Sequence, residues 1–262
     1  MTANDQNKRG QLTPQQIAFY EAFGFFVLRQ VFAHEELKII GDDFESIMQQ
    51  GHGRTTHGES ELARLIEHRP NFKRFLSRIE MSIEQVLGPG FVMTDPGSHF
   101  RAGDTGWHCD IGWHPSMFGR EQKPPIGHDL PGVRVGVYLD RRTRDTGCLR
   151  VIPGSHKANF TTPRYLLEHE SPLMQSYNCP EGSVVIFTES LTHAGGLWKS
   201  ESPRIAILNC YSPILAQYHR MDLPSEVIEA MPPKRQTLFR GVWGHAPGGK
   251  ANVFYSRENQ AQ

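Results

Sequence analysis

The feature that most constrains the fold is a change of hydrophobic pattern at about residue 91. After this point, short apolar runs follow one another without a long helical pattern between them. Residues 133–139 alternate apolar and polar side chains, which is typical of a half-buried strand. Three short, mainly apolar runs lie at residues 148–152, 184–187 and 205–208. Strands that follow strands in this way pair antiparallel, so the pattern predicts a β-sandwich or a jelly roll.

Helical patterns dominate the sequence before that point. A capping-box pattern at residues 13–16 begins a helix that is expected to end near Gly24. The apolar residues 25–28 then predict a short strand. Two further helices are expected over residues 34–50 and 71–87, where apolar side chains recur with helical spacing.

Composition limits the classes of molecule that the chain is expected to bind. The chain has 262 residues with 28 basic and 28 acidic side chains, and a net charge of 0 gives no electrostatic footprint for nucleic acid or an anionic membrane. No apolar run approaches the ~20 residues of a membrane span, and residues 1–11 lack the apolar centre of a signal peptide. The four cysteines match no CxxC spacing. We therefore expect a soluble, cytoplasmic protein that binds neither nucleic acid nor membrane; the sequence carries no signal for its oligomeric state.

The 13 histidines justify a search for metal ligands. The strongest local signal is His108 and Asp110, because side chains two apart on a strand point the same way and can bind one ion together. His193 follows the apolar run 184–187 and is the best candidate for a third ligand. Two histidines and one carboxylate form the facial triad of non-haem Fe(II) oxygenases. On spacing alone, an ordinary histidine beside a carboxylate is the commoner explanation of such a pair.

Arg204 follows His193 by 11 positions. A hairpin between the two residues would bring them into one pocket, where an arginine can bind a carboxylate through two parallel hydrogen bonds. This arrangement suits a dicarboxylate cosubstrate that chelates the metal at its other end. The alternative, and the commoner case, is an arginine that begins a strand at the edge of a sheet.

Three motifs in order resemble the phytanoyl-CoA dioxygenase (PhyH) family. Residues 147–156, GCLRVIPGSH, are similar to the family's G-x-L-x-V-I-P-G-S-H segment, and they lie between W-H-x-D at 107–110 and H-x10-R at 193–204. Residues 12–37 also resemble the family's opening of a helix, a Gly-Phe strand and a second helix. The resemblance covers about residues 12–215. It implies a double-stranded β-helix, a cupin-like jelly roll, with the metal at one mouth.

Together these patterns predict one mainly β domain with a helical N-terminal layer. Residues 1–11 are expected to form a disordered tail and residues 12–255 a single oxygenase domain. The expected parts of that domain are a helical layer at 12–90, a jelly-roll core at 91–215 and a C-terminal segment at 216–255.

The resemblance also implies the cofactors and the reaction. His108, Asp110 and His193 would bind Fe(II), and Arg204 would bind the far carboxylate of 2-oxoglutarate. With O2, such an enzyme hydroxylates an unactivated C–H bond of a small organic molecule and releases succinate and CO2. Desaturation, epoxidation and ring closure would use the same residues. Halogenation is disfavoured, because related halogenases carry a small residue at the position of Asp110.

The chain departs from the family beside the third ligand. Many members carry Ser or Thr two positions after the distal histidine, where this sequence has Gly195 followed by Gly196. Glycines there permit a close backbone approach or a bulge. The strand expected over residues 93–101 should line the cosubstrate pocket. Its candidates for contact with 2-oxoglutarate are Thr94, Ser98 and His99.

The substrate is the least determined part. The loop at 111–132 begins directly after Asp110 and is expected to cover the substrate. Residues 107–114 are similar to the same region of ectoine hydroxylases of this family, which implies a small, partly polar substrate. Candidate substrate contacts are Trp113, His114, Arg134 and Tyr138, of which the last two face either the pocket or solvent.

Two other functions compete with the oxygenase. A non-catalytic jelly-roll protein that binds a metal or small molecule would be favoured by loss of any ligand or of Arg204, and none is lost. A zinc hydrolase built on the same triad would leave Arg204 without a role.

Overall fold

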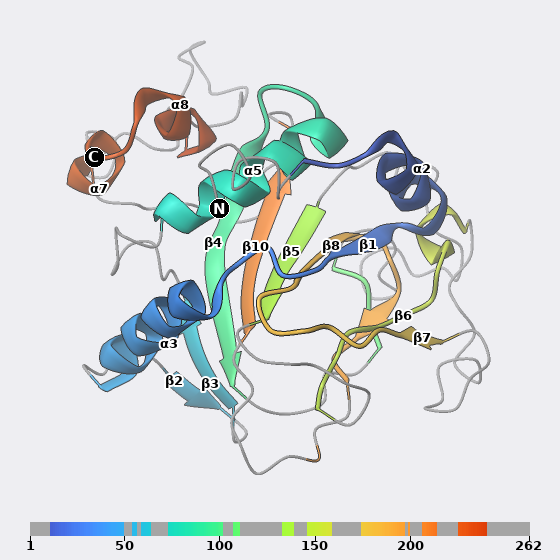
Figure 1. The fold of residues 1–262 in the computed structure, drawn as a ribbon, viewed down its shortest axis with the longest axis horizontal. Helices are drawn as coiled ribbons and strands as arrows, with labels where there is room; N and C mark the ends of the chain where they lie inside the picture. Colours follow the sequence, from blue (N-terminus) through green and yellow to red (C-terminus); the bar gives the residue numbers. More distant parts are fainter. Residues whose placement is uncertain are drawn as a thin grey trace, which may run out of the picture.

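The computed structural model describes residues 11–49, 54–56, 59–63, 73–101, 107–110, 133–138, 146–158, 174–196, 199, 206–213 and 225–239. The helices are α2 (Pro14–Phe23), α3 (His34–Gln49), α5 (Lys73–Leu87), α7 (Ser225–Glu229) and α8 (Pro233–Gln236), with 3-10 turns at Ser155–Lys157 and Thr237–Phe239 (Figure 1). The strands are β1 (Phe25–Leu28), β2 (Arg54–Thr56), β3 (Glu59–Ala63), β4 (Val92–Arg101), β5 (Val133–Tyr138), β6 (Arg150–Val151), β7 (Gln175–Ser176), β8 (Val184–Thr188), β9 (His193–Ala194) and β10 (Ala206–Ser212). Within these residues no helix is long and apolar enough to cross a membrane.

The strands form two antiparallel sheets. Seven of them make one sheet in the order β1-β8-β5-β10-β4-β3-β2, and three short strands make a second in the order β7-β6-β9 (Figure 1). Each apolar run expected to be a strand supplies one: β5, β6, β8 and β10. The predicted antiparallel architecture is therefore confirmed.

The first ninety residues differ from the prediction in one respect. The helices α2, α3 and α5 and the strand β1 lie where the sequence places them, although α5 begins at Lys73 rather than 71. The polar residues of β2 and β3, however, form a hairpin that extends the seven-stranded sheet beside β4. This segment therefore contributes strands as well as helices. Polar strands at a sheet edge carry no apolar alternation, which is why the pattern gave no signal for them.

Local capping explains the limits of α2. The Gln16 amide donates to the Thr13 hydroxyl over 3.2 Å, and the Thr13 amide donates to Gln16 Oε1 over 2.8 Å, so the predicted capping box is present. Gly24 ends the helix at φ 83°, a left-handed conformation that glycine adopts without steric strain.

The core lies on both faces of the main sheet. Alternate residues of β8 pack into different apolar clusters: Ile186 joins one with α3 and α5, and Phe187 joins another with β6 and the turn after β8. Leu37 of α3 and Ile83 of α5 are buried in the first cluster, so these helices cover that face (Figure 1). This two-sided burial follows from the period of two in a strand. It leaves the opposite face, with Phe187, toward the second sheet.

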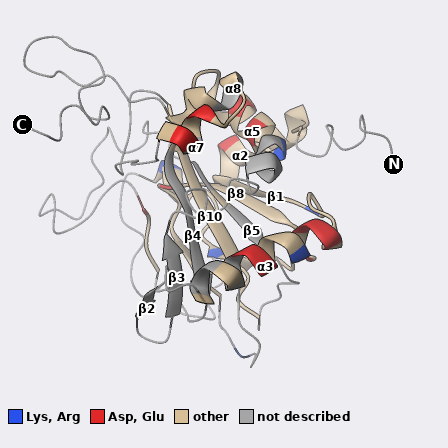
Figure 2. Ribbon diagram, turned by 90° about the vertical axis from the view of Figure 1, so that its left-hand side faces the viewer, with Lys and Arg blue, Asp and Glu red and all other residues tan. Residues whose placement is uncertain are grey.

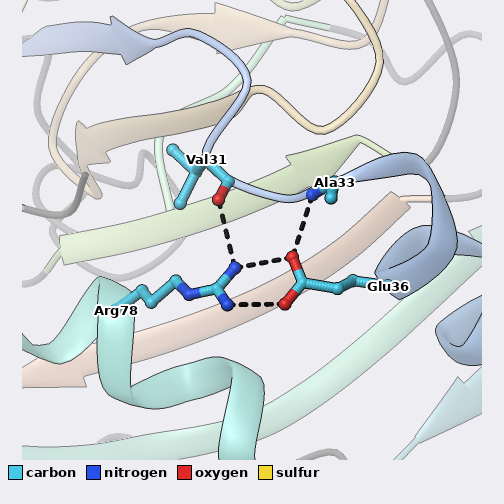
Figure 3. Close-up of polar contacts among 4 residues, drawn as sticks. All are labelled: Val31, Ala33, Glu36 and Arg78. Carbon is cyan, nitrogen blue, oxygen red and sulfur yellow. Dashed lines mark hydrogen bonds and ion pairs between the residues drawn. The ribbon is translucent and has the colours of Figure 1, made fainter. Parts of the chain in front are cut away.

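A largely buried arginine, Arg78, joins α5 to α3. Arg78 donates to both carboxylate oxygens of Glu36, over 2.6 and 2.5 Å, and to the Val31 carbonyl over 3.3 Å (Figure 3). Glu36 also accepts from the Ala33 amide over 2.9 Å at the start of α3. Figure 2 marks the acidic positions of α3 and α7 in red. Glu35, Glu36 and Glu226 lie in first turns, where a negative charge favours the start of a helix.

Candidate metal centre

Backbone pairing brings the predicted ligands together. His108 and His193 form an isolated antiparallel bridge, in which each amide donates to the other's carbonyl over 2.9 and 2.8 Å. The Asp110 amide donates to the Glu189 carbonyl over 2.8 Å, which fixes the aspartate beside the turn that follows β8. The spacing of His108 and Asp110 predicts that both lie on a strand. The structure gives them a single bridge and a bend instead.

The three side chains converge on one point. One ligand atom from each of His108, Asp110 and His193 lies within 4.8 Å of the other two. His108 Nε2 is 3.6 Å from Asp110 Oδ1, and His193 Nε2 is 3.5 Å from Asp110 Oδ2. Within the described parts of the chain, no second group of three such residues comes this close. The site is open on one side, because the exposed fraction rises from 5% for the His193 side chain to 16% for Asp110 and 43% for His108.

The orientation of His193 is fixed by its neighbours. Its Nδ1 is 2.8 Å from the Leu191 carbonyl, an acceptor only, so Nδ1 donates to it and Nε2 is the atom on the side of Asp110 that can serve as a ligand. The ring also packs against Phe187, with 4.7 Å between ring centroids. A histidine whose second nitrogen donates to a carbonyl is the usual arrangement of a metal ligand.

The GCLRVIPGSH segment supports the turn that carries His193. The Thr192 amide donates to the Ser155 hydroxyl over 2.8 Å, and the Ile152 amide donates to the Thr192 carbonyl over 2.9 Å. Gly154 and His156 contact the end of α2: the Gly154 amide donates to the Phe23 carbonyl over 3.0 Å. His156 Nε2 is 3.3 Å from the Glu21 carbonyl, so the segment joins α2 to the metal-ligand turn.

Two buried titratable groups lie around this turn. Burial raises the pKa of Tyr20 on α2; a hydrogen bond with Thr188 lowers it and the charge of Glu189 raises it further. Burial likewise raises the pKa of the Cys148 thiol, against the opposing effects of its hydrogen bonds and of the Arg150 charge. Both groups are therefore neutral at pH 7. None of the four cysteines, all within the described residues, forms a disulfide.

The structure explains the two glycines that follow His193, Gly195 and Gly196. A Cβ on Gly196 would lie 2.1 Å from the Cys148 carbonyl oxygen, so the close backbone approach allowed by the sequence is present. The Gly195 carbonyl accepts from the buried Arg150, from Nε over 3.0 Å and from Nη2 over 2.6 Å. Sequence reasoning missed Arg150. The signal was a charged residue within an otherwise apolar run, which is buried only where its donors find acceptors.

The other predicted site residues are placed in part or not at all. Thr94, Ser98 and His99 lie on β4, where Ser98 pairs with Leu208 and His99 with Ile207; their side chains lie outside the described residues. Arg134 and Tyr138 lie on β5, opposite Cys210 and Ala206, and the same holds for their side chains. Trp113, His114 and Arg204 lie outside the described residues altogether.

The donor set fits a divalent transition metal. Two imidazole nitrogens and one carboxylate oxygen, with one histidine exposed, provide three ligands on one side and leave further coordination positions open. This is the ligand set of the 2-His-1-carboxylate centres that bind Fe(II).

Comparisons with known proteins agree with this geometry. The chain is 30% identical over 131 residues to the dioxygenase aneA of Aspergillus aculeatus, an alignment that spans 48% of this chain and 43% of that protein, so the chain matches less than half of its relative. HygX of Streptomyces hygroscopicus, solved with nickel and 2-oxoglutarate, superposes with a TM-score of 0.68 at 20% identity, over 80% of this chain and 90% of that one. The carbocyclase SnoK from nogalamycin biosynthesis, described as non-haem and α-ketoglutarate-dependent, superposes with a TM-score of 0.64 at 15% identity, over 84% and 92%. These likenesses show a common fold.

The family assignment comes from the sequence. Residues 20–206 match the family described as Phytanoyl-CoA dioxygenase (PhyH). That range includes both histidines, the aspartate and the GCLRVIPGSH segment that supports them. The chain belongs to the phytanoyl-CoA dioxygenase family.

Proposed function

We propose that this chain is an Fe(II)- and 2-oxoglutarate-dependent dioxygenase that hydroxylates an unactivated C–H bond of a small organic molecule and releases succinate and CO2. The observation that carries the proposal is the convergence of His108, Asp110 and His193 within 4.8 Å. Membership of the PhyH family supports the same reaction class. HygX, which shares the fold, has been solved with iron and with nickel and 2-oxoglutarate.

Each ligand has a distinct task in this proposal. The buried His193 presents Nε2 in a fixed direction, because its Nδ1 donates to the Leu191 carbonyl. Asp110 places one carboxylate oxygen near Nε2 of each histidine and supplies negative charge for a divalent cation. His108, on the open side, leaves room for cosubstrate and O2. When bound, iron and 2-oxoglutarate supply the oxidative decarboxylation that activates O2, while the protein orients the reactants and excludes water.

Arg204 is our candidate for the far carboxylate of 2-oxoglutarate. β10 begins at Ala206, two residues later, and two residues span at most ~7 Å. Ala206 is buried in the cluster that contains Phe187, whose ring contacts His193. This position of Ala206 supports our proposal that Arg204 serves the metal centre. A guanidinium there would bind a carboxylate bidentately without the Ser or Thr that Gly195 replaces.

We also propose that the two antiparallel sheets form a double-stranded β-helix and that residues 12–255 form one domain. The buried cluster between β8 and β6, on the face of the main sheet opposite α3 and α5, supports this arrangement. The substrate class we propose is a small, partly polar organic molecule. HygX, which has a similar fold, has been solved with hygromycin B bound.

The test is an anaerobic titration of the metal-free protein with Fe(II) and then 2-oxoglutarate. A visible metal-to-ligand charge-transfer band is expected in the wild type, with loss of the band in His193→Ala. Arg78→Met is a matched control, because Arg78 lies on α5 and its hydrogen bonds are to Val31 and Glu36 rather than to the metal ligands. Iron binding without the band would favour a metal-binding protein with a different cosubstrate, and absence of iron binding would refute the proposal.

A further inference from the structure

Arg150 is an unusual residue in the described core. It stands on β6 with 4% of its surface exposed, between Leu149 and Val151. Burial of a guanidinium is costly unless its donors are satisfied. Its Nε and Nη2 both donate to the Gly195 carbonyl, over 3.0 and 2.6 Å, and its charged group lies 5.3 Å from the centre of the Trp107 ring.

The strand register places these contacts behind the metal ligands. β6 pairs with β9 so that Val151 is opposite His193 and Arg150 is opposite Ala194. Residues opposite one another share a face, and neighbours along a strand alternate, so Arg150 and His193 project from opposite faces of the small sheet. Trp107 immediately precedes His108, which is bridged to His193. Arg150 thus contacts the chain next to both histidines without facing the metal.

These contacts reach both of the histidine-bearing segments. The Gly195 carbonyl, two residues after His193, accepts two hydrogen bonds from the charged guanidinium of Arg150. Such charge-assisted hydrogen bonds are stronger than those between neutral groups. The Trp107 ring contributes a cation–π contact at the other segment. The two backbone hydrogen bonds of the His108–His193 bridge hold the segments side by side. Arg150 adds contacts to both segments from the face of the small sheet opposite His193.

We propose that Arg150 is a positioning residue for the metal centre, which holds the segments of His108 and His193 at the spacing that a metal ion requires. This inference rests on the proposed function, because it assumes that the two histidines bind one ion. Groups that orient metal ligands typically change metal affinity by about 10- to 100-fold when they are removed.

The direction of the change in metal affinity distinguishes a positioning role of Arg150 from a purely electrostatic one. A guanidinium near the site repels a divalent cation, so Coulomb's law alone predicts tighter metal binding when Arg150 becomes methionine. Positioning predicts the opposite: weaker binding, because the histidines are no longer held at the same spacing. Methionine is a suitable replacement, since it fills much of the same length and has no donor.

The experiment titrates the metal-free full chain with Co(II) alone and records both the dissociation constant and the visible Co(II) absorption, which reports ligand geometry. We expect Arg150→Met to bind about 10- to 100-fold more weakly, with an altered spectrum, and Arg150→Lys to recover part of the affinity. Arg78→Met is the matched control: it also removes a hydrogen-bonded, largely buried arginine, and it should lower stability but leave Co(II) affinity unchanged.

The outcomes distinguish the two proposals. If the wild type fails to bind Co(II), or His193→Ala binds it equally well, the metal centre itself is refuted. If wild type binds, His193→Ala does not, and Arg150→Met binds as tightly as wild type or more tightly, the role of Arg150 is refuted while the centre stands. Should Arg150→Met not fold, Arg150→Lys and Trp107→Leu decide the matter, with about fivefold weaker binding expected for Trp107→Leu. Wild-type affinity in both would refute positioning.

Discussion

Replacement of Gly196 by alanine is expected to destabilise the protein and to weaken its metal site together. The new Cβ would lie 2.1 Å from the Cys148 carbonyl oxygen, and 2.8 Å from both the Cys148 nitrogen and the Gly147 carbonyl carbon. All three atoms belong to the backbone, so no side-chain rotation relieves the contact. Gly196 is not one of the described glycines with a positive φ, so the substitution tests steric space and not backbone strain.

The magnitude follows from the distance that must be gained. The Cβ and the carbonyl oxygen must move apart from 2.1 Å to an ordinary contact of 3.4 Å, which requires one backbone segment to shift. Overpacking of this kind costs about 2–3 kcal/mol, which for a chain of this size lowers the melting temperature by about 5–10 °C. Because Gly196 follows His193 by three residues, the same shift displaces β9 and weakens Co(II) binding.

Thermal unfolding by circular dichroism and Co(II) titration measure the two effects. Gly88→Ala is the matched control, since Gly88 has φ 80° and nothing lies within 4 Å of its would-be Cβ. That change costs about 1 kcal/mol of backbone strain and should leave metal affinity at the wild-type value. The reasoning is refuted if Gly196→Ala melts within about 1 °C of the wild type.

Three other predictions follow from the same structure. Arg204→Ala should keep Co(II) affinity but raise the 2-oxoglutarate concentration needed for succinate release at least tenfold; unchanged cosubstrate dependence would remove Arg204 from the site. Arg78→Met leaves the largely buried Glu36 without its partner, so urea unfolding should show a loss of about 2 kcal/mol, and a loss below ~0.5 kcal/mol would contradict the contacts seen in the structure. The raised pKa of Tyr20 means that the unfolded chain ionises first, so stability should fall as pH rises above about 10. Tyr20→Phe should flatten this fall, and an equally steep fall in that variant would exclude Tyr20 as its source.

Local signals made much of the fold predictable. The Thr13–Gln16 capping box gave the start of α2, and Gly24 gave its end, because both depend on atoms within one turn. The alternation of β5 and the apolar run of β8 identified strands for the same reason. The polar β2–β3 hairpin was missed, because its pairing with β4 comes from backbone hydrogen bonds that leave no mark on side-chain pattern.

The candidate site was also predictable only in part. His108, Asp110 and His193 were chosen from spacing and from the position of a strand end, and the structure brings them together. The support behind them was not predictable. The contact of Arg150 with Gly195 joins residues 45 positions apart, and it depends on the register of β6 with β9. Register between distant strands is set by the whole sheet, and no local pattern encodes it.

The place of β1 in the main sheet has a consequence for how the chain acquires its structure during synthesis. Among the strands that the structure describes, β1 pairs with β8 alone, and Phe25 is opposite Phe187. At ~5–20 residues per second, a ribosome takes about ten to thirty seconds to produce β8 after β1 has emerged. For that interval the apolar side chains of β1 lack their partner strand, and the sheet cannot be completed from its N-terminal edge. Such distant pairings slow folding, and the contacts already available to β1 in this interval are local ones with α2, such as that of Tyr20 with Phe26.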